Sequence, residues 1–176
     1  MLKYFIGGIV LFIIIIFVYA IIKNKKIDKE IESKLFDLSN KNNLILEKGK
    51  DFDCLIKNNE GELLKILVCK IPPNSSVTIN SRETICLRWG GARYGRSYPN
   101  QRYLNEVYNF LKVKDEVMKV LLLYKTTEKI LKYLNESEIA TVNEGDTTYD
   151  YKVVTFNNLD DNFLKLFERK KKWKKY

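Results

Sequence analysis

A carboxylate and an amine on two neighbouring predicted strands are the residues best placed for chemistry. Asp53 lies inside the apolar run 52–57, where an acid is costly unless it has a partner, and Lys70 lies near the end of the run 63–71. The polar turn 58–61, which ends in glycine, joins the two runs into a hairpin. Many metal-dependent nucleases use such a pair, in which the acid holds Mg²⁺ against the scissile phosphate and the lysine positions or polarises water. An Asp–Lys pair on the open face of a hairpin accounts for the same spacing.

Histidine is absent from the chain, and this absence restricts the chemistry further. Ser–His and Cys–His catalytic pairs and histidine-ligated metal sites are excluded. The three cysteines, Cys54, Cys69 and Cys86, show no C-x-x-C spacing, which excludes a zinc ribbon, a dithiol redox motif and a disulfide scaffold. Each falls on a predicted strand, where we expect a small buried apolar residue. Any chemistry therefore depends on carboxylate, lysine and a metal ion.

Arginine is concentrated in one segment of the chain. Five of the six arginines lie within 82–102, interleaved with Trp89 and three tyrosines around the glycine-rich stretch 89–98. Arginine binds phosphate through two parallel hydrogen bonds and aromatic rings stack on bases, so this segment favours contact with DNA or RNA. A glycine-rich surface loop whose arginines pair with the acids of the domain fits equally well. The arginines that we assign to a nucleic-acid surface are Arg88, Arg93, Arg96 and Arg102.

The net charge of +9 is located at the two ends of the chain. Residues 1–26 carry four lysines and no acid, residues 27–168 are nearly balanced at −1, and residues 169–176 carry six basic residues. Net charge thus gives no argument for a basic groove across the domain. The tail 169–176 contains Trp173 and Tyr176, and it suits an anionic membrane surface at about 1 kcal/mol per basic residue. A solvated terminus and a contact with nucleic acid are the alternatives.

The first 26 residues contain a segment that can cross a membrane. Residues 5–22 are uncharged and rich in Ile and Phe, and as a helix they span about 27 Å, close to the hydrocarbon core of about 30 Å. We interpret 1–26 as a retained anchor, because the apolar stretch is longer than a usual signal-peptide core and continues past the loose cleavage motif 18–20. A cleaved signal peptide is the alternative.

The charges that flank this segment predict its orientation. Four lysines lie between 23 and 29, whereas Lys3 alone precedes the segment, so the positive-inside rule places the C-terminal domain in the cytoplasm. The odd number of thiols agrees with a reducing compartment. We therefore expect a single-pass protein of the cell membrane with a cytoplasmic body.

Hydrophobic periodicity predicts one domain over 27–168, after the membrane segment. An amphipathic helix is expected over 27–41, where apolar residues recur at helical spacing. A second helix is expected over 98–113, capped by Ser97, and the apolar run 117–124 is typical of a strand covered on both faces. The other expected elements are strands at 44–46, 52–57, 63–71, 76–80, 84–88, 138–142 and 151–156, a short helix at about 126–134 and a last helix at about 159–167. This order indicates an α/β fold, or alternatively α+β, with a mixed central sheet flanked by helices.

Four stretches in this order resemble the nuclease-related (NERD) domain of the restriction-endonuclease-like superfamily, whose core is helix, three strands, helix, strand. They are 30–38 in the first helix, 51–56 around Asp53, 66–70 ending in Lys70, and 89–101 from Trp89 to Gln101. The resemblance covers about 27–135. It implies a restriction-endonuclease-like fold, metal binding by Asp53 and catalytic roles for Asp53, Lys70 and Gln101.

The chain departs from this family at one ligand position. In the acid-x-Lys pattern of the third strand the acid falls on Val68, and valine cannot bind a metal. Another acid can replace the missing one in space, either Glu106 in the second helix or Glu32 in the first, although both can equally be surface charges.

These observations together predict a membrane-anchored protein with a cytoplasmic nuclease-related domain that binds DNA or RNA. Mg²⁺-dependent phosphodiester hydrolysis by this domain is doubtful, because the second metal-binding acid of the site is missing. The alternative is a membrane-anchored interaction or assembly protein without chemistry, whose protein partner the sequence does not identify.

Overall fold

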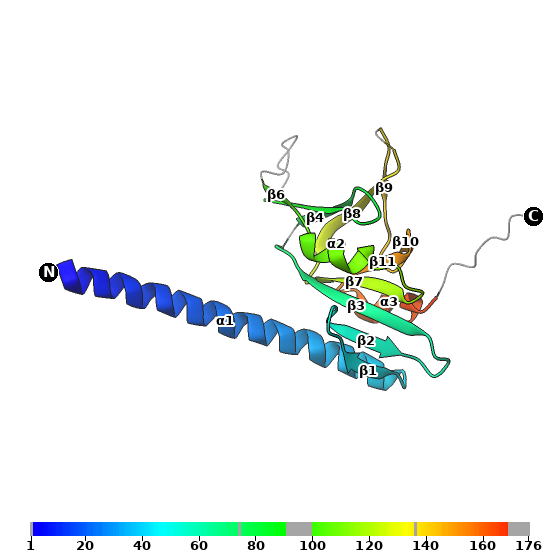
Figure 1. Ribbon diagram of the computed structural model, residues 1–176, viewed down its shortest axis with the longest axis horizontal. Helices are drawn as coiled ribbons and strands as arrows, with labels where there is room; N and C mark the ends of the chain where they lie inside the picture. The colour runs from blue at the N-terminus through cyan, green and yellow to red at the C-terminus, as the bar shows by residue number, and fades with distance from the viewer. Residues whose placement is uncertain (1, 74, 91–99, 136, 169–176) are drawn as a thin grey trace, which may run out of the picture. The chain divides into compact units, whose positions relative to one another are not determined.

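The computed structural model describes residues 2–73, 75–90, 100–135 and 137–168 (Figure 1). The chain divides into two units, Met1–Leu38 and Ser39–Tyr176. Within the described residues the fold is mixed α/β, with an N-terminal apolar helix and two mixed sheets. The expected mixed α/β class is confirmed. The strands, however, form two sheets where one central sheet was expected.

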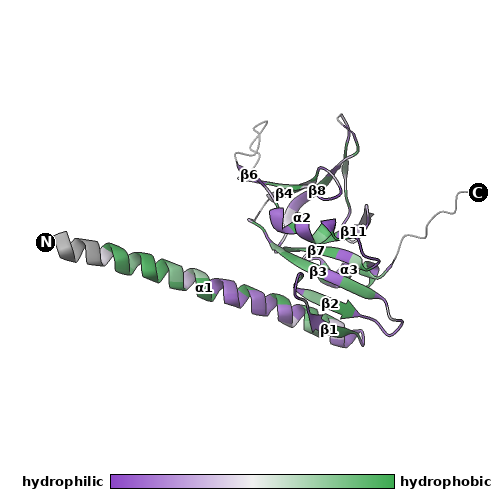
Figure 2. Ribbon diagram, viewed as in Figure 1, coloured by the Kyte–Doolittle hydropathy of each residue, from purple (hydrophilic) through white to green (hydrophobic). Residues whose placement is uncertain are grey.

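Helix α1 (Leu2–Lys41) runs without a break through the expected anchor and the expected helix over 27–41. It is apolar towards its N-terminus and charged towards its C-terminus, as the colour change in Figure 2 shows. The large apolar side chains between Ile9 and Ile22 are exposed. Among the described helices, α1 alone is long and apolar enough to cross a membrane, a property that an N-terminal signal sequence shares.

The larger sheet has the strand order β1-β2-β3-β7-β11-β10. Its strands are β1 (Ile45–Lys48), β2 (Cys54–Lys57), β3 (Leu63–Lys70), β7 (Met118–Tyr124), β10 (Thr147–Thr148) and β11 (Tyr151–Thr155). β1, β2 and β3 form an antiparallel meander, to which β7 and β11 add in parallel, and β10 pairs antiparallel with β11. Every residue of β7 after Met118 is buried, which confirms the prediction of a strand covered on both faces.

The smaller sheet has the strand order β6-β5-β4-β8-β9. Its strands are β4 (Ser75–Ile79), β5 (Ile85–Trp89), β6 (Asn100–Tyr103), β8 (Thr127–Tyr133) and β9 (Ile139–Thr141). β4 and β8 run parallel at its centre. β5 pairs antiparallel with β4, β6 pairs antiparallel with β5, and β9 pairs antiparallel with β8.

Two parallel strands pass from the larger sheet into the smaller one. β3 is followed by β4 and β7 by β8, so that the parallel pair β3–β7 continues as the parallel pair β4–β8. Across the break, the amide of Ile71 donates to the carbonyl of Tyr124 at 3.0 Å, and the hydroxyl of Thr127 donates to the carbonyl of Ser75 at 2.5 Å. The residues at 72 and 73 are prolines, which have no N–H for a ladder, so pairing is interrupted between the two sheets.

Helix α2 (Asn105–Lys112) packs its apolar stripe into a core that both sheets share. Val107, Phe110 and Leu111 of the helix are buried in one cluster with Leu121 of β7 and Val77 of β4. This core positions α2 over the larger sheet, and the side chains at its polar border form the site described below.

Two expected helical stretches are strands in the structure. Residues 100–103, expected within the helix 98–113, form β6 and pair antiparallel with β5, so that α2 begins only at Asn105. Residues 127–133, expected as a short helix, form β8 between β4 and β9. In each case hydrogen-bond partners distant in the sequence decide the structure, and local periodicity does not register such partners. The expected cap, Ser97, lies outside the described residues.

The last expected helix is shorter than predicted. It consists of α3 (Leu159–Asn162) and the 3₁₀ turn η1 (Leu164–Leu166). Of the four apolar positions predicted for this helix, Leu159, Phe163 and Leu166 are buried and Phe167 is half-buried, so the pattern predicted most of the packing side of this segment.

Candidate functional site

Asp53 lies one residue before β2 and is exposed, whereas a position inside an apolar strand was expected. Its carboxylate accepts a hydrogen bond from the amide of Val68 at 2.6 Å, and its own N–H donates to the carbonyl of Ile66 at 3.0 Å. Continuing the β2–β3 register would place Phe52 opposite Val68. The Asp53 carboxylate therefore supplies an acceptor where the ladder would otherwise need a main-chain carbonyl.

Lys70, the expected partner of Asp53, is the exposed last residue of β3. It lies on the opposite face of the sheet from Cys69, because successive residues of a strand point to opposite faces. Cys69 belongs to the core shared with α2, and burial raises the pKa of its thiol, an effect to which the carboxylates of Glu106 and Asp53 add. Asp53 and Glu106 are thus near Cys69, and the pleat directs Lys70 away from them.

Gln101, the third predicted catalytic residue, lies in β6 of the smaller sheet. The antiparallel register places it opposite Arg88 of β5, so these two predicted site residues are neighbours on one face. Asp53 and Lys70, in contrast, belong to the larger sheet: Asp53 lies directly before β2, and Lys70 is the last residue of β3. The three predicted catalytic residues are therefore divided between two sheets.

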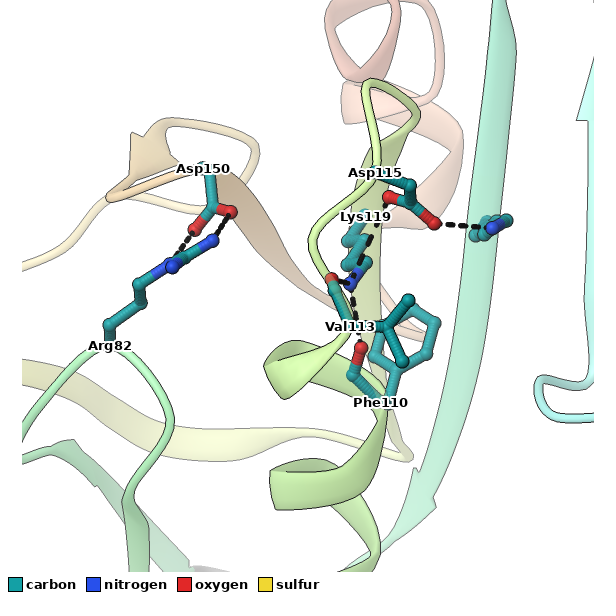
Figure 3. A network of polar contacts seen from close by, with 7 residues as sticks. Arg82, Phe110, Val113, Asp115, Lys119 and Asp150 are labelled. Atoms are coloured by element: carbon teal, nitrogen blue, oxygen red, sulfur yellow. Dashed lines mark hydrogen bonds and ion pairs between the residues drawn. The ribbon is translucent and has the colours of Figure 1, made fainter.

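Two arginines of the predicted nucleic-acid segment contact acids. Arg82 donates from Nε to Oδ1 of Asp150 at 2.9 Å and from Nη2 to Oδ2, as Figure 3 shows. This hydrogen bonding holds the pKa of Asp150 below its ordinary value. Nη2 of Arg102 in β6 lies 3.6 Å from Oε1 of Glu106 in α2. These pairs match the alternative in which the arginines are neutralised by acids of the domain.

The remaining predicted arginines differ in what the structure shows. Arg88 is half-buried, and its Nε is buried without a hydrogen-bond partner among the described residues. Arg93 and Arg96 lie outside the described residues. The nucleic-acid surface therefore stays a prediction.

A pocket of about 450 Å³ opens beside α2, and Glu106 is among the residues that line it. Its apolar lining comes from Phe52, Phe110 and Val113. Its polar lining consists of Asp51, Lys65, Glu106, Asn109, Asp115 and Lys119. None of the three predicted catalytic residues is among the residues that line it.

A buried lysine forms the floor of this pocket. Lys119 of β7 has 3% of its side chain exposed, and its ammonium donates to the carbonyl of Phe110 at 2.7 Å and to that of Val113, at the end of α2 (Figure 3). Asp115 lies between two amines: Oδ2 accepts from Lys65, and Oδ1 is 3.8 Å from Lys119 and has no hydrogen-bond partner among the described residues. Burial lowers the pKa of Lys119, and the nearby Asp115 opposes this effect.

The sequence contains a signal that Lys119 is buried with polar partners, which hydrophobic periodicity alone does not detect. Lys119 interrupts the apolar run 117–124, and a charged side chain in a covered strand must find polar partners. Lys152 in β11 is the same case, since it is buried and donates to the carbonyl of Glu168 at 2.8 Å and to that of Lys165. Lys65 likewise interrupts the apolar run 63–71, whereas Asp115 lies at an ordinary polar position and carries no such signal.

The residues around Asp53 do not offer Mg²⁺ the expected ligands. Within the described part of the chain, no group of three or more Asp, Glu, Cys or His side chains can hold a metal ion. Glu106 is the nearby second carboxylate, but it contacts Arg102, and the Asp53 carboxylate is engaged by the Val68 amide. Glu32, the other candidate acid, lies in α1 in the first unit.

Comparisons of the chain with protein-family models, with curated proteins and with solved structures found no match. The interpretation of the site therefore depends on its geometry and on the residues that form it.

Proposed function

We propose that this is a single-pass protein of the cell membrane whose cytoplasmic body is a nuclease-related, restriction-endonuclease-like domain that binds DNA or RNA without cleaving it. One observation on β3 carries the proposal. Val68 occupies the acid position of the acid-x-Lys pattern, and its amide holds the carboxylate of Asp53. The remaining acid is thereby used in the strand ladder, while Lys70 faces the other side of the sheet.

The strand order supports the restriction-endonuclease-like part of the proposal. That core consists of a helix, three strands, a helix and a further strand. Here α1 precedes the meander β1-β2-β3, and α2 precedes β7, which pairs in parallel with β3. The smaller sheet is built from segments between β3 and α2 and between β7 and β11, so it is an addition to this order.

Binding and cleavage can be measured separately on the full-length protein purified in a neutral detergent. We expect labelled DNA or RNA to bind with an affinity that falls steeply with salt, as phosphate contacts require, and to remain intact in Mg²⁺. The double change Arg93→Gln and Arg96→Gln should weaken binding about tenfold, because it removes two candidate phosphate contacts. The double change Lys57→Gln and Lys114→Gln removes the same charge from exposed positions and serves as the control.

Two results would contradict the proposal. Equal weakening by both double variants would show that binding follows overall charge and not the arginine segment. Cleavage in Mg²⁺ that is lost in Asp53→Ala would show that Asp53 still acts in a hydrolytic site.

The ion pairs of the arginine segment favour a second candidate, a membrane-anchored interaction or assembly protein. Arg82 is bound by Asp150 and Arg102 contacts Glu106, so part of the basic charge is already compensated. The same binding experiment separates the two candidates, because an assembly protein would bind neither DNA nor RNA at low salt.

A further inference from the structure

We propose that the pocket beside α2 binds a linear aliphatic di- or polyamine, a ligand that the proposed function does not require. The volume of about 450 Å³ lies in the range of sites that enclose small ligands. Phe52, Phe110 and Val113 give the pocket apolar walls, against which the methylene groups of an aliphatic chain can pack.

The positive groups of the pocket are already bound within the protein. Lys119 donates to two carbonyl oxygens at the negative end of the α2 dipole, and Lys65 donates to Asp115. The Nζ atom of Lys65 also lies over the ring of Phe52, 5.4 Å from its centroid. These contacts leave the two amines little capacity to hold an anionic ligand.

The negative groups, in contrast, are only partly compensated. Asp51 lines the pocket from an exposed position and has no hydrogen bond or ion pair among the described residues. Glu106 contacts Arg102 at 3.6 Å with nearly half of both side chains exposed, a kind of pair that contributes about 0–1 kcal/mol. Oδ1 of Asp115 is buried and accepts no hydrogen bond within the described part of the chain, although the Lys119 ammonium lies 3.8 Å from it and Lys65 donates to Oδ2. An ammonium group, which has three donors and no acceptor, matches these oxygens.

Glu106, which lines the pocket, also acts on the buried thiol of Cys69 in the core shared with α2. Beyond the effect of burial, the carboxylates of Glu106 and Asp53 raise its pKa, and the opposing effect of Arg102 is smaller.

Spermidine is the probe for this proposal, titrated calorimetrically into the full-length protein in a neutral detergent without nucleic acid. We expect Asp51→Asn and Glu106→Gln each to weaken binding about tenfold, because each removes a charged acceptor. Glu116→Gln is the matched control, since Glu116 is an exposed acid close in sequence to Asp115 that does not line the pocket. Both test residues are exposed, and thermal unfolding of each single variant checks that the fold is retained.

Each alternative outcome would overturn the assignment. Equal weakening by Glu116→Gln would indicate diffuse attraction to negative charge. Binding of Mg²⁺ with the same dependence on Asp51 and Glu106 would indicate an inorganic cation site. Binding of a lysine-containing peptide, with no binding of spermidine, would indicate the side chain of a protein partner. Because nucleic acid is absent from the assay, its result is independent of the proposed DNA or RNA binding.

Discussion

Lys119 and Lys152 lie on neighbouring strands of the larger sheet and point to opposite faces, because the register places Lys152 opposite Val120. On its own face each ammonium donates to two carbonyl oxygens, Lys119 at the end of α2 and Lys152 beyond the start of η1. Burial lowers the pKa of both amines, so these carbonyl contacts stabilise a charge that the interior disfavours. Each lysine thereby connects a strand to the helical segment that covers it.

Replacing Lys119 with Met tests this role, because Met preserves the apolar stem and removes the donor. The carbonyls of Phe110 and Val113 and the Asp115 carboxylate would lose a partner, and we expect the free energy of unfolding to fall by about 2 kcal/mol. Lys114→Met, at an exposed position, should change it by no more than about 0.5 kcal/mol. Urea unfolding of the full-length protein in a neutral detergent, followed by Trp fluorescence, measures both; equal stabilities would show that the capping bonds contribute nothing.

The pair between Arg82 and Asp150 predicts a change of stability with pH. Its hydrogen bonds lower the pKa of Asp150 in the folded state, so the folded protein binds fewer protons than the unfolded chain between the two pKa values. The stabilisation is therefore complete above about pH 5 and is lost as the pH falls through the folded-state pKa. Asp150→Asn should be less stable than the wild type at about pH 6, and the difference should shrink as the pH falls through the folded-state pKa. A difference that persists at low pH would mean that Asp150 acts through packing and not through its charge.

At this scale the sequence predicts which residues need a partner better than it predicts the partner. Asp53 was expected to require one because an acid inside an apolar strand is costly, and it has one although it lies just before the strand. The partner is the Val68 amide and not Lys70, because Asp53 lies just outside β2, where its carboxylate reaches a backbone group. Asp115 was not predicted at all, because Lys65, the lysine that donates to it, lies 50 residues away in the sequence.

Among the elements, the β2–β3 hairpin depends on Asp53 at its open end. Asp53→Ala removes the acceptor of the Val68 amide, whereas Asp53→Asn keeps an oxygen there. We expect Asp53→Ala to lower the free energy of unfolding by about 1 kcal/mol and to raise the exchange rate of the Val68 amide, and Asp53→Asn to retain most of its protection. Hydrogen exchange read by mass spectrometry on peptides of β3 measures this. Slow exchange of the Val68 amide in Asp53→Ala would show that the Asp53 carboxylate is not part of the strand ladder. The carboxylate would then be available for a catalytic role.

The elements that the sequence predicted correctly are those whose signal is local. The turn 58–61 contains Gly61 at φ +82°, a conformation that glycine adopts without strain, and β7 follows from seven nearly uninterrupted apolar residues. β6 and β8 were predicted as helix because apolar residues at helical spacing follow β6 and threonines precede β8. Their pairing with β5 and β4 is set across 11 or more residues of chain, information that a single sequence window does not contain.

At the scale of the whole molecule, charge and hydropathy divide the chain into parts with separate roles. The apolar part of α1 has no charge over 18 residues, and lysines follow it directly, whereas residues 27–168 are nearly neutral. A neutral body has no long-range attraction to an anionic surface or to nucleic acid, so its contacts must be local, in the arginine segment or in the pocket beside α2. The proposed membrane anchor, in contrast, lies within the first 26 residues and is testable without reference to the body.

The orientation of the anchor follows from the lysines on either side of it. Changing all four lysines after the apolar segment to Gln leaves Lys3 and the N-terminus as the nearest positive charges. We therefore expect the body, which we propose is cytoplasmic, to become mixed in orientation. The substitutions are Lys23→Gln, Lys25→Gln, Lys26→Gln and Lys29→Gln. Protease digestion of a C-terminal tag on intact cells and on inverted membrane vesicles measures the side.

The control carries Lys50→Gln, Lys57→Gln, Lys112→Gln and Lys114→Gln, which remove the same charge far from the segment and should leave the tag cytoplasmic. Digestion of the wild-type tag on intact cells would reverse the assignment, and a chain shortened by about 20 residues and released from the membrane would identify α1 as the carrier of a cleaved signal peptide.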